Sequence, residues 1–170
     1  MMLEGERIYL RKTNSKDLKI IKQWLQKPEI RIPYGFGEGL EKSFICSENN
    51  HAFMIVTKKP RRIIGACHVN YILDRGDIGI IIGDKSWHGK GYGTEALKLL
   101  LDCGFNTLGY NFIGLQVFGF NIPAIRCYEK VGFKEITRLK DSVIYENKLY
   151  DWIFIGLSKK EYLKQNILGR

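Results

Sequence analysis

The sequence predicts a single α/β (α+β) domain whose sheet has a mostly antiparallel start, and three observations lead to this prediction. The chain has 170 residues, which is the length of one domain. Hydrophobic residues make up 45% of it and aromatic residues 12%, enough to build a buried core and to exclude a disordered chain. Strand-like and helix-like segments alternate without repeats or a linker, so we expect one domain over residues 1–170.

The first part of the chain is typical of a strand, an amphipathic helix and a loop. Residues 7–11 alternate polar and apolar side chains, as a half-buried strand does. Asn14 or Ser15 can cap a helix whose apolar residues recur at helical spacing, and Pro28 is expected to end it. The proline and glycines of residues 29–43 indicate a mobile loop, which a short helix could follow.

The rest of the chain alternates β-branched segments with two helices that carry apolar stripes. A basic turn at residues 58–62 is expected to join the first two of these strands into a hairpin. The second helix stops at Gly132, because glycine suits the left-handed turn after a helix end. The strands are expected at 52–57, 63–72, 78–82, 112–118, 133–138 and 150–157, and the helices at 94–108 and 123–131.

The charge of the chain indicates an anionic partner without saying which one. Lys and Arg total 27 against 18 Asp and Glu, a net charge of +9, which suits a nucleic acid, an acidic membrane or an anionic small molecule. No apolar run approaches the roughly 18 residues of a membrane span, and the start resembles no signal peptide. The four cysteines form no CxxC pair, so we expect reduced thiols and a cytoplasmic protein. The dispersed histidines and cysteines predict no metal site.

A glycine-rich loop, Trp87-His88-Gly89-Lys90-Gly91-Tyr92-Gly93-Thr94, follows a predicted strand and opens a predicted helix. Glycines let backbone N–H groups turn inward, and the helix N-terminus adds about half a positive charge, so this order predicts a phosphate cradle. An ordinary flexible turn is the alternative. The P-loop pattern is absent. The dinucleotide pattern GxGxxA matches from Gly91, but the next strand lacks the acidic residue that such a fold needs.

A second motif, Asn121-Ile122-Pro123-Ala124-Ile125-Arg126-Cys127-Tyr128-Glu129-Lys130-Val131-Gly132-Phe133, follows the next strand. Together with the glycine loop it resembles the GNAT superfamily of acetyl-CoA-dependent N-acetyltransferases, in particular the branch that acetylates ribosomal-protein N-termini and small amines. The resemblance implies a mixed, mostly antiparallel sheet of about seven strands, flanked by helices. It also implies that the sheet is splayed between the fourth and fifth strands, here residues 78–82 and 112–118.

The resemblance assigns cofactor contacts to three parts of the chain. The pantetheine of acetyl-CoA would pair with the backbone of Ile80, Ile81 and Ile82, as an added strand does. The phosphates would bind the loop residues His88, Gly89, Lys90, Gly91, Tyr92, Gly93 and Thr94, mainly through backbone amides. His88 stands where the family usually has Gln or Arg. Asn121 matches an asparagine that contacts the cofactor, although a helix cap is an equal alternative.

The resemblance also suggests two catalytic residues. Tyr128 matches the tyrosine that protonates the departing CoA thiolate, and the alternative is a half-buried helix aromatic. Asp77, at the start of the strand that holds the thioester, is the best-placed base, and the alternative is a turn residue that caps the strand. Asp74, Glu146 and Asp151 are weaker candidates.

Four aromatic residues have less specific interpretations. His68 is interpreted as structural and Trp24 as a core residue. Tyr34 and Phe36 are candidates for the wall of an acceptor pocket.

The expected function is therefore direct acetyl transfer from acetyl-CoA to a primary amine in a ternary complex. The acceptor is open: a protein N-terminus, a polyamine, an amino sugar or another small amine. A non-catalytic acyl-CoA sensor is one alternative, and a nucleic-acid-binding domain is another, although no nucleic-acid motif is present. We expect neither a nucleic-acid nor a membrane partner, and a homodimer is possible. The charge that remains after CoA binds disfavours a strongly cationic amine unless acidic residues line the pocket.

Overall fold

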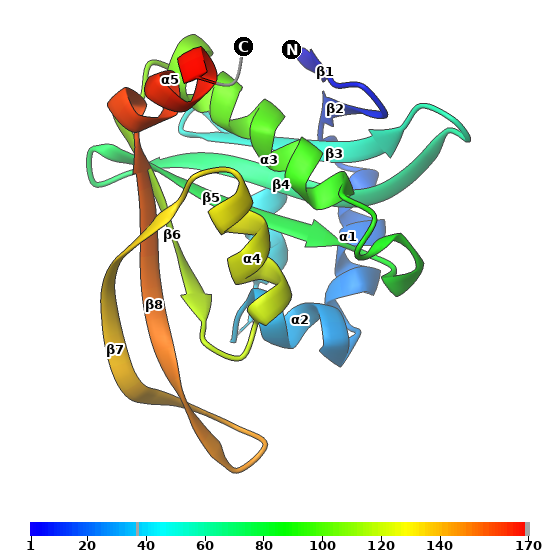
Figure 1. Cartoon of the computed structure of the whole chain (residues 1–170). Helices are drawn as coiled ribbons and strands as arrows, with labels where there is room; N and C mark the ends of the chain where they lie inside the picture. The colour runs from blue at the N-terminus through cyan, green and yellow to red at the C-terminus, as the bar shows by residue number, and fades with distance from the viewer. Residues whose placement is uncertain (37, 169–170) are drawn as a thin grey trace.

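The computed structural model describes residues 1–36 and 38–168, which form one curved sheet with helices on both faces (Figure 1). The sheet has eight strands in the order β1-β2-β3-β4-β5-β6-β8-β7. The strands are β1 (Met2–Glu4), β2 (Ile8–Lys12), β3 (Asn50–Thr57), β4 (Arg62–Ile72), β5 (Arg75–Ile82), β6 (Phe112–Phe118), β7 (Lys134–Tyr145) and β8 (Lys148–Ser158). The α-helices are α1 (Asp17–Leu25), α2 (Pro28–Tyr34), α3 (Tyr92–Asp102), α4 (Ile122–Lys130) and α5 (Lys159–Leu168).

The structure confirms the α/β class and corrects several predicted elements. The sheet has eight strands and not about seven, because the short strand β1 pairs with β2. The two final strands are longer than expected and form the hairpin that projects from the body of the molecule (Figure 1). The predicted helix 94–108 begins earlier, at Tyr92, and its last turn is a π-helix over Cys103–Thr107.

The segment expected to be a loop at residues 29–43 is helical over much of its length. Pro28 does not merely follow α1; it is the first residue of α2, where its missing N–H costs nothing and its fixed φ suits a helix. Ile30 is buried against the α1 side of the sheet, and a 3₁₀ helix follows over Leu40–Phe44. Burial of these apolar residues therefore outweighs the proline and glycine content of the segment.

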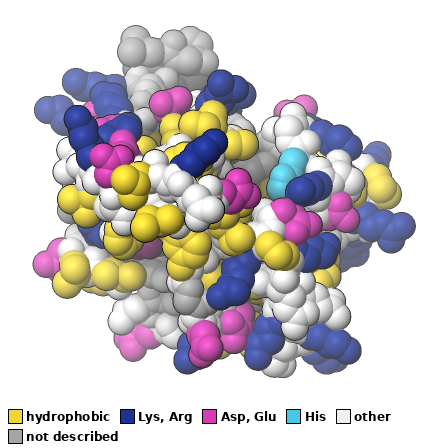
Figure 2. Space-filling model, turned by 90° about the horizontal axis from the view of Figure 1, so that it is seen from below, with side chains coloured by type: hydrophobic (Ala, Val, Ile, Leu, Met, Phe, Trp, Pro, Cys, Tyr) yellow, Lys and Arg dark blue, Asp and Glu magenta, His cyan; other side chains and the backbone are white. Residues whose placement is uncertain are grey.

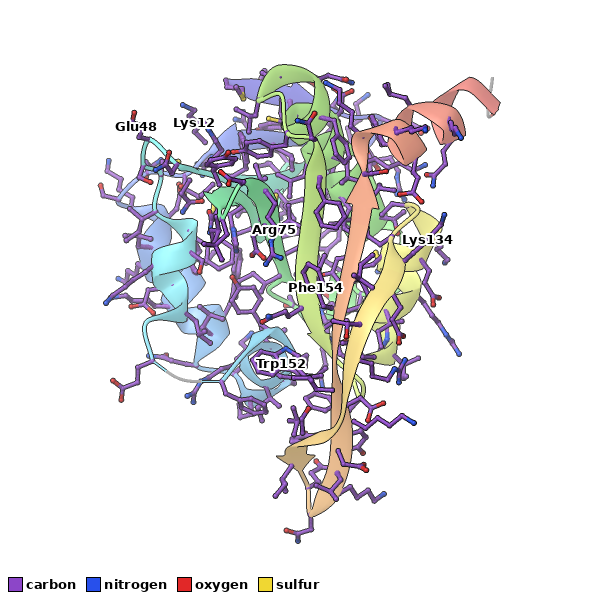
Figure 3. The ribbon with its side chains drawn as sticks, turned by 90° about the vertical axis from the view of Figure 1, so that its left-hand side faces the viewer. Lys12, Glu48, Arg75, Lys134, Trp152 and Phe154 are labelled. Atoms are coloured by element: carbon purple, nitrogen blue, oxygen red, sulfur yellow. The ribbon has the colours of Figure 1, made fainter. Side chains whose placement is uncertain are left out.

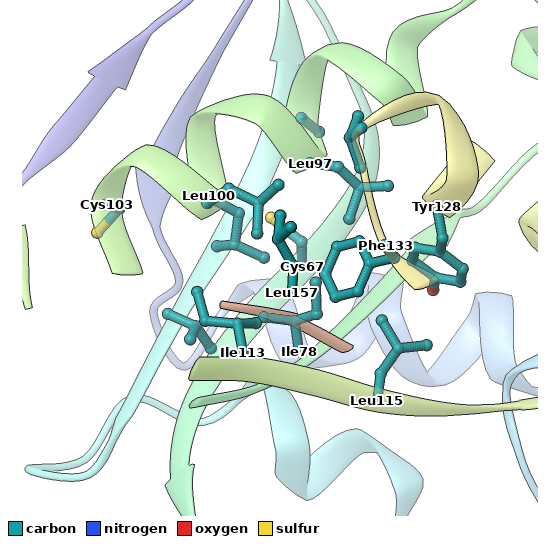
Figure 4. Close-up of a cluster of buried hydrophobic side chains, with 14 of the residues drawn as sticks. Cys67, Ile78, Leu97, Leu100, Cys103, Ile113, Leu115, Tyr128, Phe133 and Leu157 are labelled. Atoms are coloured by element: carbon teal, nitrogen blue, oxygen red, sulfur yellow. The ribbon is translucent and has the colours of Figure 1, made fainter. Parts of the chain in front are cut away.

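Two cores hold the helices to the sheet. Alternating side chains of each strand point to opposite faces, so Ile78 of β5 packs under α3 and α4 whereas Ile81 packs toward α1 and α2. Figure 4 shows the larger cluster, in which Leu97 and Leu100 of α3 lie over Ile113 and Leu157. Both leucines are fully buried, and each contributes about 1.5–3 kcal/mol by leaving water.

The sheet opens between β5 and β6, as predicted. These are parallel neighbours, and their register contains only the pairs Gly76–Ile113 and Asp77–Gly114. Beyond these pairs β5 continues along β4 up to Ile82, while β6 continues along β8 up to Phe118. The two strands therefore diverge from Asp77 onward, with α4 beside the gap between their ribbons (Figure 1).

Candidate active site

The glycine loop is tied to the start of the chain by the ion pair of Arg7 and Glu95. Glu95, in the first turn of α3, accepts hydrogen bonds from the backbone N–H groups of Arg7 (2.8 Å) and Ile8 (3.2 Å) and from Arg7 Nε (3.0 Å). Burial raises the pKa of Glu95, but these hydrogen bonds outweigh it and bring the pKa below its usual value. Arg7 also donates to the Lys90 carbonyl (2.9 Å) and lies over the Tyr92 ring. The loop is thus braced against β2.

Two glycines give the loop its backbone shape. Gly89 and Gly91 have φ of +69° and +82°, left-handed values that side chains rarely adopt. A Cβ on Gly89 would meet nothing within 4 Å, so glycine is needed there for conformation and not for space. Gly91 caps α3, whose first N–H groups have no partner inside the helix. These donors suit a phosphate, as the sequence predicted.

The side chains of His88 and Thr94 hold the loop in place. His88 Nε2 lies 3.0 Å from the carbonyl oxygen of Ile82, at the end of β5. Thr94 Oγ1 lies 3.2 Å from Cys127 Sγ of α4, and a Cβ on Gly93 would lie 3.8 Å from the same sulfur. The His88 N–H donates to the Lys85 carbonyl at 3.0 Å, so the amides that the loop offers a phosphate are those at the start of α3, which supports the expected mode of phosphate binding.

The edge of β5 that faces β6 is open from Ile78 onward. Within the described residues no strand pairs with Ile80, Ile81 or Ile82 on that side, since the register with β6 ends at Asp77. An extended ligand can therefore add to this edge by backbone hydrogen bonds. The side chain of Ile81 is buried in the α1 side core, while Ile80 and Ile82 pack toward α3.

Asp77 and Tyr128, the two predicted catalytic residues, lie on β5 and α4, and the Asp77 carboxylate is near enough to raise the pKa of the Tyr128 phenol. Tyr128 is 6% exposed on α4, and its ring meets Phe133 edge-on with centroids 5.7 Å apart (Figure 4). Burial raises the pKa of the Tyr128 phenol, and the neighbouring Cys127, Tyr34 and Asp77 raise it further.

Asp77 is the last residue of β5 that pairs with β6, so its carboxyl lies where the sheet opens. The side chain is 27% exposed, and Arg75 Nη2 lies 3.8 Å from Asp77 Oδ2. Burial raises the pKa of Asp77 more than Arg75 lowers it. A carboxyl with a raised pKa is a stronger base than usual, and such groups cluster at functional sites.

Asn121 is the cap of α4, as one of its two interpretations predicted. Its Oδ1 accepts from the Ala124 N–H at 3.4 Å, and its Nδ2 donates to the Pro33 carbonyl of α2 at 3.1 Å. The side chain therefore links the two helices on either side of the opening, and a contact with a cofactor stays a prediction.

A polar group that the sequence did not predict lies on the α2 face of β4 and β5. Tyr34 Oη is 3.0 Å from Nε2 of His68, whose ring lies over Gly79 of the paired strand. A Cβ on Gly79 would come within 2.3 Å of that nitrogen, so only glycine leaves room for the imidazole. His68 is 4% exposed, and burial lowers its pKa to about 4, which makes it neutral at pH 7. Sequence reasoning missed this group because only strand register brings His68 and Gly79 together.

Three buried polar atoms on these two strands have no hydrogen-bond partner: His68 Nδ1, Asn70 Oδ1 and Arg75 Nε. Asn70 pairs with Asp77 across the strands, His68 pairs with Gly79, and Arg75 lies two residues before Asp77, so all three residues lie near the position where the sheet opens. Unpaired buried polar atoms are rare in folded proteins, and they are typical of sites that bind a ligand or water.

The remaining sequence candidates lie elsewhere or play other roles. Asp74 accepts from the Tyr71 hydroxyl in the β4–β5 turn, and Asp151 is paired with Arg138 at 2.6 Å. Glu146 lies in the β7–β8 turn. These three carboxyls are not brought to the Asp77 position.

The aromatic candidates separate into core and surface residues. Trp24 is buried, as predicted, whereas Phe36 is half-exposed and packs at a tilt against Phe118, with ring centroids 4.8 Å apart. Seen from below, the molecule presents apolar side chains at the centre of its face, with Lys and Arg mostly toward the rim (Figure 2).

Within the described part of the chain, no group of three or more His, Cys, Asp and Glu side chains is arranged to hold a metal ion. No helix there is both long and apolar enough to cross a membrane.

Comparisons with known proteins agree with this geometry. The family model of the acetyltransferase (GNAT) domain matches residues 7–134. An uncharacterized N-acetyltransferase, p20, from Bacillus licheniformis is 29% identical over 94% of this chain and 97% of its own length. Spermidine N(1)-acetyltransferase from Escherichia coli K12 is 25% identical over 97% of this chain and 93% of its own.

Solved structures share the fold. A GNAT-family acetyltransferase from Bacillus anthracis superposes with a TM-score of 0.78 at 20% identity, covering 95% of this chain and 100% of its own. Spermidine N-acetyltransferase from Vibrio cholerae, in complex with CoA and spermine, has the same TM-score at 23% identity, with 92% and 98% covered. With a family model that spans most of the chain and a sheet that opens beside a glycine loop, the protein belongs to the GNAT family of acetyl-CoA-dependent N-acetyltransferases.

Proposed function

We propose that this protein transfers an acetyl group from acetyl-CoA to a primary amine by direct attack in a ternary complex. The observation that carries the proposal is the end of β5–β6 pairing at Asp77, whose carboxylate raises the pKa of both Tyr34 and Tyr128. One element on each side of the opening thus contributes an ionisable group to it.

The glycine loop and the free edge of β5 support the placement of acetyl-CoA. The unpaired N–H groups at the start of α3 would bind its pyrophosphate, and the backbone of Ile80 to Ile82 would pair with its pantetheine. The net charge of +9 suits a multiply phosphorylated ligand.

The proposed reaction transfers one acetyl group, removes one proton from the amine and adds one proton to the leaving thiolate. The neutral amine attacks the thioester carbonyl carbon, the C–N bond forms, and the C–S bond breaks. Asp77 takes the proton that the ammonium group must lose, and Tyr128 donates a proton to the departing thiolate. The raised pKa of each group supports its role, because Asp77 becomes a stronger base and Tyr128 stays protonated at neutral pH.

The first test is release of thiol from acetyl-CoA with a panel of spermidine, N-terminal peptides, amino sugars and amino acids. Release with at least one amine is the expected result. If CoA binds but no amine causes release, the protein is a sensor and not an enzyme. Salt-dependent binding of DNA or RNA without affinity for CoA would favour the nucleic-acid alternative.

The Tyr128→Phe variant tests the acid. Turnover should fall by about 10² or more, since a positioned proton donor contributes 10²–10⁴. Tyr9→Phe, on β2 at the far side of the sheet, is the matched control and should leave turnover unchanged. A decrease of less than about threefold in Tyr128→Phe would exclude the role of Tyr128 as the acid.

The Asp77→Asn variant tests the base. Because burial raises the pKa of Asp77, kcat/KM should rise with pH through a limb that lies above the ordinary carboxyl range. The limb reflects loss of a proton from the free enzyme, so it should disappear in Asp77→Asn. An unchanged pH profile would show that another group or water is the base.

The acceptor, the homodimer and the cytoplasmic location stay predictions. A spermidine acetyltransferase among the relatives makes polyamines one acceptor class to test.

A further inference from the structure

Arg75 is a charged residue at the proposed site that the reaction does not use. It is the first residue of β5 and points to the same face as Asp77, two residues further along the strand. Its guanidinium lies over the ring of Phe154, on β8, with 4.5 Å from Cζ to the ring centroid. Figure 3 shows the two side chains next to each other, on the side of the sheet where α2 lies.

The guanidinium of Arg75 lacks the partners that a partly buried arginine normally has. Only 28% of its side chain is exposed, and Nε is fully buried without a hydrogen bond. The described residues offer it one carboxylate, Asp77, and the distance of 3.8 Å is too long for a hydrogen bond. The two Nη groups carry four further N–H donors in a fork that matches an oxyanion, and the exposed part of the guanidinium can offer these to a ligand.

The neighbouring groups define what kind of ligand suits this position. Asp77 carries a negative charge next to the positive charge of Arg75, and Asn70 Oδ1 is a buried acceptor without a partner. An ammonium group would find its acceptor at the partly exposed Asp77, and an oxyanion would find its donors at Arg75. The pair therefore complements a ligand that carries both charges a few bonds apart.

We propose that the acceptor is a primary amine that also bears an oxyanion, such as the carboxylate of an amino acid, and that Arg75 binds this oxyanion. The inference rests on the acetyl transfer proposed above and specifies its acceptor. Arg75 is the specificity-determining residue: its guanidinium binds the oxyanion while Asp77 binds the amine.

A polyamine fits this arrangement less well. A polyamine has no anionic group for Arg75 to bind. Because the charges of Arg75 and Asp77 offset each other, the pair holds only one ammonium group, and the guanidinium repels any further one. The net charge of +9 adds to this repulsion. The apolar surface of Phe154 and its neighbour Phe112, with centroids 6.4 Å apart, is available to the rest of the acceptor.

The experiment compares amines that differ only in the oxyanion, with thiol release from acetyl-CoA as the readout. Small, acidic and aromatic L-amino acids are paired with their amides, O-phosphoethanolamine is paired with ethanolamine, and spermidine is included. The wild-type protein should use at least one anionic member with a kcat/KM about tenfold or more above its neutral partner. The two pair types distinguish a carboxylate from a phosphate as the oxyanion.

Arg75→Met should remove this preference by raising KM, while Arg75→Lys, which keeps the charge without the fork, should retain part of it. Arg61→Met is the matched control, since this exposed arginine also lies over a ring, that of Tyr9, but at the far end of β4. Unchanged CoA binding and thermal unfolding would show that the variants fold.

The outcomes separate the two proposals. Preference for amides or spermidine in the wild-type protein, or a preference for the anionic member that survives in Arg75→Met, would overturn the role of Arg75 and leave acetyl transfer intact. Absence of thiol release with every amine would overturn acetyl transfer itself, and the acceptor inference with it.

Discussion

Acidification from pH 7 to pH 4 should destabilise the fold through His68. Burial lowers the pKa of this imidazole from its ordinary 6.5 to about 4. The unfolded chain takes up the proton near pH 6.5 and the folded protein only near pH 4. The unfolded state therefore binds more protons between these values, and stability is lost as the pH falls through this window.

The magnitude follows from the two pKa values. At about 1.4 kcal/mol for each pKa unit, the difference between 6.5 and about 4 amounts to ~3 kcal/mol. A typical domain is stable by about 5–15 kcal/mol, so this single group accounts for a large share of the margin. Below pH 4 the folded state binds the same proton, and His68 contributes no further loss.

Urea unfolding at a series of pH values between 7 and 4 measures this effect. His68→Gln keeps a polar side chain beside Tyr34 but does not titrate, so its free energy of unfolding should fall less steeply than that of the wild type. His88→Gln, at an exposed histidine, is the control and should follow the wild type. Carboxylates titrate in all three proteins and cancel in the comparison. Parallel curves for wild type and His68→Gln would refute the reasoning.

Two further predictions concern packing and the glycine loop. Gly79→Ala should lower the free energy of unfolding in urea by about 1–3 kcal/mol, because its Cβ would crowd His68 Nε2. Gly35→Ala is the control and should change stability little, because its Cβ would make an ordinary contact at 3.4 Å. Equal effects of the two substitutions would contradict the crowding argument. Glu95→Ala removes the brace between the loop and β2, so KM for acetyl-CoA should rise about tenfold with kcat less affected. Glu41→Ala removes a partly exposed ion pair with Lys22, at 3.7 Å, and should leave KM unchanged. A similar KM for both variants would exclude the brace.

Local patterns predicted the strands and motifs well. Period-two apolar segments located β6 at Phe112–Phe118, and the glycine run located the start of α3. These patterns failed where burial in the tertiary structure determines whether a segment forms a helix or a strand. Helix α2 was expected to be a loop because proline and glycine dominate its neighbourhood, yet Ile30 gains more by burial than the segment loses in propensity. Helix α5 was missed, and strand β1 gains its only partner when it pairs with β2.

The sequence by itself determined the family, the glycine loop and the α4 motif, because each is a contiguous run whose backbone requirements are written in neighbouring residues. Only the tertiary structure decided what meets at the opening of the sheet. Strand register places Asp77 at the last β5–β6 pair and His68 over Gly79, and helix packing brings Tyr34 and Tyr128 beside them. The same packing leaves Arg75 Nε buried without a hydrogen-bond partner, and this depends on distances between elements that no local pattern encodes.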